Sequence, residues 1–208
     1  RIVPKEMPRE MIYEIIEAYA EAALRLQKAG CDGVEVLAGM GYLVAQFMNP
    51  STNQRKDEFG GSFENRLRFL SEILIKTRAK VGDEFVIGIR VSGDELDGLG
   101  LDAKEMLKVC KTIDDKQLVD YFNVIAGSSA TPFGWIRVFP PMEVKPLYAA
   151  PFAEEIRKNV SRPVILGGRI NQPQEAEKMI SEGVADFCAM VRPFIADPEF
   201  AIKSENGK

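Results

Sequence analysis

Five short apolar runs alternate with amphipathic segments along this chain, and no other feature constrains its fold as strongly. The runs are Val34–Leu37, Phe85–Val91, Asp120–Ile125, Pro163–Leu166 and Ala185–Val191. In the second run the apolar residues stand at consecutive positions, as in parallel strands that are covered on both faces. Strands that alternate with helices favour a parallel sheet with right-handed crossovers. The sequence therefore predicts an α/β fold.

The segments between these runs show helical spacing of their apolar residues. Pro8–Ala29 is strongly amphipathic, with Pro8 suited to the first turn and Gly30 to the position after the last. Ser62 is a suitable N-cap for a second helix, which Val81–Asp83 ends. Three more helices are expected over Asp102–Lys116, Tyr148–Asn159 and Pro173–Glu182.

Two connections are long. Gly41–Arg66 is rich in turn, cap and ion-pair residues, which suit neither a strand nor a core-facing helix. It also carries four aromatic residues, so we expect an ordered active-site loop rather than a disordered one. Gly127–Leu147 contains Trp135 and Phe139 but shows no clear period, and these two side chains could line a substrate site or pack in the core.

Composition excludes several classes of chemistry. The net charge of −4 gives no basic surplus for nucleic acid, and we expect a soluble, cytoplasmic protein with no membrane partner. Histidine is absent, which excludes Ser-His and Cys-His triads and imidazole acids or bases. The three cysteines (Cys31, Cys110 and Cys188) are expected to be buried free thiols in a reducing compartment, and no metal site is predicted.

Candidate ligand-binding residues follow the last two predicted strands. Gly167-Gly168-Arg169 and Val191-Arg192 stand where both open α/β sheets and (β/α)8 barrels bind ligands. Small residues let backbone N–H groups approach a phosphate, and arginine offers a planar fork of donors. The alternative is that the glycines form a plain turn and that both arginines make surface ion pairs.

Other charged residues fall in or beside the second predicted strand. Arg90 interrupts an apolar run, so it needs either a ligand or a carboxylate such as Glu35 or Asp94. Glu95, Asp97 and Asp102 form an acidic stretch that we expect to be a solvated loop.

The string GYLVAQFMNPSTNQRKDEFGGSFENR, over residues 41–66, resembles the signature of the Old Yellow Enzyme family of FMN-dependent oxidoreductases. The chain is most similar to the large bacterial branch, which includes 2,4-dienoyl-CoA reductase, 2-enoate reductase and amine dehydrogenases. This resemblance implies a (β/α)8 barrel, of which residues 1–208 would supply strands four to eight with their helices. Strands one to three would be missing, and the absence of an initial Met fits excision from a longer polypeptide.

The resemblance also implies roles for single residues. Gly168, Arg169, Val191 and Arg192 would hold the FMN phosphate, and Arg90 would face the pyrimidine side of the flavin. Tyr42 would be the proton donor, the alternative being a tyrosine packed under the loop with its hydroxyl on a backbone carbonyl.

The resemblance implies a fragment of an enzyme that passes hydride from NAD(P)H through FMN to an activated alkene, such as an enoate or enoyl-CoA. The parent could also carry FAD and a 4Fe-4S cluster outside this chain. Leu37 and Met40 stand where many members have a carbonyl-binding histidine pair, which leaves the small-molecule substrate open. The alternatives are a flavin-dependent amine dehydrogenase or demethylase, and a non-catalytic fragment that binds no flavin. We also expect a homo-oligomer that pairs open sheet edges.

Overall fold

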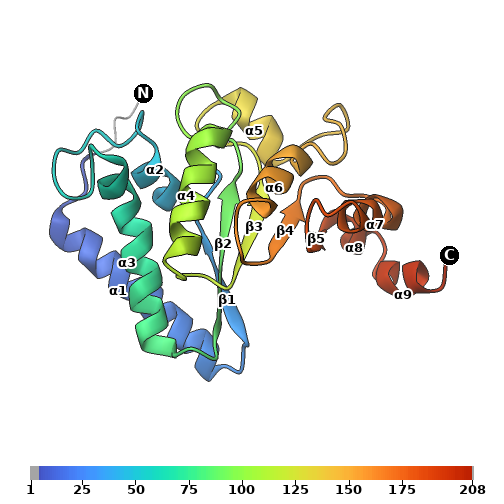
Figure 1. The fold of residues 1–208 in the computed structure, drawn as a ribbon, viewed down its shortest axis with the longest axis horizontal. Helices are drawn as coiled ribbons and strands as arrows, with labels where there is room; N and C mark the ends of the chain where they lie inside the picture. Colours follow the sequence, from blue (N-terminus) through green and yellow to red (C-terminus); the bar gives the residue numbers. More distant parts are fainter. Residues whose placement is uncertain (1–4, 208) are drawn as a thin grey trace.

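A parallel five-stranded sheet organises the structure, a computed structural model that describes residues 5–207 (Figure 1). Its strands follow one another in the sheet in the order of the chain, so every connection is a crossover between neighbours. The register sets Leu37 beside Arg90 and Arg90 beside Asn123. The strands are β1 (Gly33–Leu37), β2 (Val86–Ser92), β3 (Tyr121–Ile125), β4 (Val164–Gly167) and β5 (Phe187–Ala189). The predicted α/β class with parallel strands is confirmed.

Helices connect these strands and cover one face of the sheet. In Figure 1, α1 and α3 lie side by side at one end of the molecule, and α8 and α9 lie at the other. The helices are α1 (Arg9–Lys28), α2 (Leu43–Met48), α3 (Phe63–Val81), α4 (Ala103–Asp115), α5 (Pro132–Val138), α6 (Ala150–Arg157), α7 (Pro173–Ser181), α8 (Arg192–Ala196) and α9 (Phe200–Glu205). The expected N-cap of α3 is present, because the Ser62 hydroxyl accepts a hydrogen bond from Asn65 N–H.

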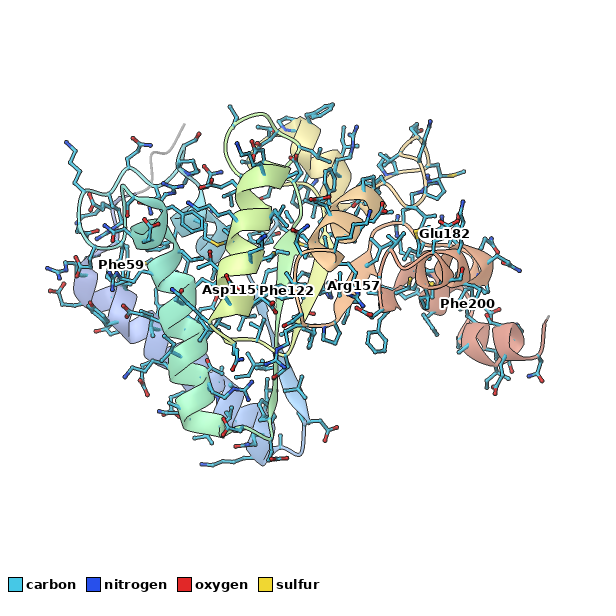
Figure 2. The ribbon with its side chains drawn as sticks, in the orientation of Figure 1. Phe59, Asp115, Phe122, Arg157, Glu182 and Phe200 are labelled. Atoms are coloured by element: carbon cyan, nitrogen blue, oxygen red, sulfur yellow. The ribbon has the colours of Figure 1, made fainter. Side chains whose placement is uncertain are left out.

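The core lies between the sheet and its helices. Alternate strand side chains point toward the helices, including Ile89, Phe122 and Leu166, and these are completely buried. Figure 2 shows Phe122 near the centre of the molecule. The intervening residues face the other side of the sheet, where Glu35, Arg90 and Asn123 lie on adjacent strands. This second face therefore carries polar groups that the helices do not cover.

The structure corrects several predicted boundaries. Gly41–Arg66 contains α2, which the sequence analysis missed because its four buried residues occupy less than two turns. Gly127–Leu147 contains α5, which begins with Thr131 accepting a hydrogen bond from Gly134 N–H. The fifth strand covers only Phe187–Ala189, and the chain then turns into α8 and α9, which were not predicted.

The residues of the Gly41–Arg66 connection hold it in one conformation, as expected. Asn53 donates both amide hydrogens to backbone carbonyls, to Phe47 O at 2.6 Å and Phe59 O at 2.7 Å. Arg55 forms a two-pronged contact with Asp57 and also donates to Met7 O at 2.7 Å. None of the helices in residues 5–207 is both long and apolar enough to cross a bilayer.

Candidate functional site

The sheet carries a pocket of about 150 Å³ at the carboxyl ends of its strands. Five of the six residues predicted from the sequence line it, and they come from three different strand ends: Arg90, Gly168, Arg169, Val191 and Arg192. Gly168 and Arg192 therefore lie at one site although 23 positions separate them. The other lining residues are Met40, Asn123, Ile125, Val138, Pro140, Tyr148, Gly167, Ile170, Ala189, Met190 and Pro193.

Gly168 and Arg169 form the turn after β4. Gly168 has φ +137°, which side chains disfavour, and a Cβ there would lie 3.0 Å from the Tyr148 ring. Arg169 also has a positive φ, of 52°, and its guanidinium donates to Val144 O. Few non-glycine residues adopt this conformation, and those that do are often found at binding sites. The turn is therefore more constrained than the plain turn of the alternative interpretation.

Val191 and Arg192 follow β5. Arg192 Nη1 donates to Pro140 O at 2.8 Å, so both arginines contact the segment between α5 and α6. Neither guanidinium lies within ion-pair distance of a described carboxylate. The alternative of surface ion pairs is therefore wrong for residues 5–207. Each guanidinium keeps further N–H donors for another ligand.

Unused backbone donors surround the same turn. Within residues 5–207, the N–H groups of Gly168, Arg169, Val191 and Arg192 donate to no protein acceptor. The lining residues include three arginines and no carboxylate. Backbone donors and positive charge together favour an anionic group, and phosphate oxygens accept such bonds well.

Two lining residues on the sheet face, Arg90 and Asn123, contact the carboxylate of Glu35, which does not itself line the pocket. Arg90 Nε lies 2.8 Å from Glu35 Oε1, an ion-pair distance, although its N–H is not aligned on that oxygen. Asn123 Nδ2 donates to the other Glu35 oxygen at 2.8 Å. The pKa of Tyr121, which is beside Glu35, is raised to about 12. Burial of the Tyr121 hydroxyl is the main cause, and the negative charge of Glu35 is the next. Glu35 supplies the carboxylate partner that Arg90 was expected to need. Because Arg90 is only partly buried, its side chain also reaches the pocket.

Asp94 does not pair with Arg90. Its carboxylate caps backbone N–H groups instead, at Leu96 (2.7 Å) and Ala103 (3.1 Å). Of the two carboxylates considered from the sequence, only Glu35 is the ion-pair partner of Arg90.

Tyr42 stands apart from the other predicted residues. It precedes α2, its side chain is 41% exposed, and it does not line the pocket. Its hydroxyl makes no hydrogen bond to a described backbone carbonyl, so the alternative of a packed tyrosine is wrong. Met40, two residues earlier, does line the pocket and has φ 61°, held by a hydrogen bond from its N–H to Ser92 Oγ at 2.9 Å.

Three other expectations need correction. Glu95 is 1% exposed rather than solvated, and its carboxylate accepts hydrogen bonds from Asn49 and Leu101. Cys31 is exposed, so only Cys110 of the three cysteines is fully buried. Trp135 and Phe139 pack edge to face on α5 at 5.0 Å but remain open to solvent, so they are not core residues.

Sequence reasoning missed Asn123 as a site residue. It is a polar residue inside an apolar strand, as Arg90 is, and strand alternation places it on the same face as Arg90. The sequence therefore contained a signal for Asn123. It contained no such signal for Tyr148 and Pro140, because the fold of the Gly127–Leu147 connection brings them to the pocket.

The fold and the site together define a parallel α/β protein with a positively charged site at its strand ends. The model of the NADH:flavin oxidoreductase / NADH oxidase family matches residues 1–208. The chain belongs to this family.

Named relatives agree with this assignment. The chain is 37% identical to an N,N-dimethylglycine/sarcosine dehydrogenase of Chromohalobacter salexigens, over 96% of this chain and 29% of the relative. It is 38% identical to an NADH oxidase of Thermoanaerobacter brockii, over 99% of this chain and 31% of the relative. The structure of a 2-naphthoyl-CoA reductase in complex with 2-naphthoyl-CoA has a TM-score of 0.92 at 36% identity, covering 98% of this chain and 30% of that one. The chain thus spans about a third or less of these relatives.

Proposed function

We propose that this chain is part of an FMN-dependent oxidoreductase that transfers hydride from NAD(P)H to an activated alkene, of the enoate or enoyl-CoA type. The strand-end pocket carries the proposal, because it joins unused backbone donors and three arginines without a carboxylate. Strands one to three of the barrel would lie in polypeptide outside this chain. Any FAD or 4Fe-4S centre of the parent would also lie there.

The residues present fit a flavin mononucleotide. Gly168, Arg169, Val191 and Arg192 would hold its phosphate, because their N–H groups are free and two of them carry a guanidinium. Arg90 would place positive charge beside the pyrimidine part of the ring. FMN supplies the ring that accepts a hydride from the nicotinamide and passes it to the substrate.

Tyr42 remains the proposed proton donor. Its exposed phenol lies on the loop that leaves β1, at the same end of the sheet as the pocket. The structure does not bring it into the pocket lining, so this role rests on the family resemblance and on the accessibility of its hydroxyl. The substrate would therefore approach from the side of α2.

A second candidate is a flavin-dependent amine dehydrogenase. The dimethylglycine/sarcosine dehydrogenase among its relatives favours this function. A cationic amine is recognised by aromatic faces or carboxylates. Trp135 and Tyr42 are accessible, but neither lines the pocket, so the described residues form no aromatic cage beside it. The alkene reductase is therefore the better-supported proposal.

The experiment that tests the proposal begins with flavin titration. The purified protein should bind FMN, and Arg192→Ala should weaken FMN about ten- to hundredfold, the value of one hydrogen bond between charged groups. Riboflavin lacks the phosphate, so its affinity should change little in the same variant. Arg25→Ala, an exposed arginine on α1, is the matched control. Absence of flavin binding would favour the non-catalytic fragment.

Half-reactions then separate the two enzymes. Flavin absorbance of the purified protein should bleach with NADH or NADPH and recover with an enoate. Bleaching by sarcosine in the absence of NAD(P)H would instead assign the amine dehydrogenase. Equal weakening of FMN and riboflavin by Arg192→Ala would remove that residue from the phosphate site.

A further inference from the structure

Asn123 has a polar atom that the protein leaves without a partner. The residue is 3% exposed, and its Oδ1 accepts no hydrogen bond from any described residue. A buried carbonyl without a donor costs roughly 1–3 kcal/mol, so such groups usually meet water or a ligand. Asn123 lines the strand-end pocket, which makes a ligand the relevant partner.

Glu35 fixes the orientation of this amide. Asn123 Nδ2 donates to Glu35 Oε2 at 2.8 Å, and an ionised carboxylate can only accept hydrogen bonds. Turning the amide over would set two oxygens against each other. Oδ1 is therefore held on the opposite side, toward β4.

The strand next to Oδ1, β4, ends in glycine at Gly167. A Cβ at Gly167 would lie 3.6 Å from Asn123 Oδ1 and 3.0 Å from Ile125 Cγ2. Gly167 has no positive φ, so its backbone conformation does not require glycine. Glycine instead keeps a side chain away from the amide oxygen, which is itself enclosed, so a ligand hydroxyl would reach it with a small shift of the neighbouring groups.

The strand order places Asn123 between the two ends of the proposed ligand. Arg90, assigned to the ring, lies on β2, and Gly168, assigned to the phosphate, follows β4. Asn123 is on β3 between them, paired in register with Arg90. Two strand spacings amount to roughly 10 Å, which a short polyol chain can bridge.

We propose that Asn123 Oδ1 accepts a hydrogen bond from a hydroxyl of the ribityl chain that joins ring and phosphate in FMN. Glu35 is a positioning residue, which acts by holding the Asn123 amide. This inference rests on the proposed function and adds a recognition element for the middle of the cofactor. It predicts that the protein distinguishes FMN from analogues that lack one ribityl hydroxyl.

The test is a set of affinities measured by quenching of flavin fluorescence. FMN and its 2′-, 3′- and 4′-deoxy analogues are titrated into the wild-type protein and into Asn123→Leu. One analogue should bind the wild type roughly three- to tenfold more weakly than FMN, the value of a neutral hydrogen bond. In Asn123→Leu this deficit should vanish, while Asn206→Leu, the same change on the exposed C-terminal turn, should keep it.

Glu35→Gln separates positioning from contact. A glutamine amide can donate to Asn123 Oδ1, which lets the Asn123 amide turn over, so the same deficit should shrink. Thermal unfolding of each variant shows whether it is folded, and Glu35→Gln serves as the second measurement if Asn123→Leu is not. The inference is overturned if all three analogues bind the wild type as tightly as FMN, or if the deficit survives both Asn123→Leu and Glu35→Gln. A wild-type protein that binds no FMN would instead contradict the proposed function.

Discussion

At the scale of single residues, Glu95 shows how a buried carboxylate joins the loop after β2 to the loop after α2. Its Oε2 accepts hydrogen bonds from Asn49 Nδ2 at 2.7 Å and from Leu101 N at 3.3 Å. Burial raises the pKa of Glu95 above its ordinary value, and the charge of Asp97 acts in the same direction. The folded protein therefore holds a proton on Glu95 more readily than the unfolded chain does.

This shift predicts a pH-dependent effect of Glu95→Gln. Between the ordinary Glu pKa of 4.5 and the raised folded value, the native state binds more protons than the unfolded state. The contribution of Glu95 to stability is therefore fully present below pH 4.5 and is lost as pH rises through the folded pKa. The free energy of unfolding of Glu95→Gln relative to wild type should rise over this interval, as measured by urea unfolding at a series of pH values. A difference that does not change with pH would contradict the buried titration.

At the scale of elements, the part of the Gly41–Arg66 connection between α2 and α3 is held by side-chain hydrogen bonds rather than by regular structure. Asn53 lies at its centre and joins the end of α2 to Phe59, whose side chain is completely buried. Figure 2 shows Phe59 at the end of the molecule where α1 and α3 meet. The conformation of this connection therefore depends on the orientation of one amide.

Asn53→Asp should destabilise the protein by about 3 kcal/mol. The substitution keeps the shape of the side chain but replaces two N–H donors with an oxygen that faces two carbonyls. Gln54→Glu makes the same chemical change at the neighbouring exposed residue and should cost less than about 0.5 kcal/mol. Urea unfolding measures both. Equal effects of the two variants would show that the Asn53 amide does not hold the connection.

At the scale of the whole molecule, burial is uneven. β2 and β3 pair with a strand on each side, and their helix-facing residues are completely buried. At the other end, α8 and α9 bury no residue, and α9 contacts α8 through Phe194 and Phe200 at 5.3 Å. Figures 1 and 2 show this C-terminal end extending away from the sheet. We therefore expect local stability to fall from the centre of the sheet toward α9.

Hydrogen exchange of the 208-residue chain tests this gradient. Amides of α9 should exchange through local opening that costs little free energy, because few buried contacts are lost. Amides of β2 and β3 should approach the protection set by global unfolding. If α9 is protected as strongly as β2, the C-terminal helices are packed against something that this chain alone does not provide.

The sequence by itself determined the class of fold and most of the strand-end site. Consecutive apolar residues in Phe85–Val91 specify a parallel strand, and helical spacing in Pro8–Ala29 specifies the first helix. Gly168 and Arg192 were recognisable because each follows such a strand, and parallel strands end at one edge of the sheet. These features depend on residues near one another in the chain.

Only the tertiary structure decided which side chains meet. Glu35, Arg90 and Asn123 come together through strand register, and Arg169 and Arg192 contact the α5–α6 segment through its fold. Burial of Glu95 and exposure of Tyr42 were likewise invisible in a linear pattern. The physical reason is that hydrogen bonding and desolvation depend on contacts between distant parts of the chain, whereas periodicity reports only on neighbours.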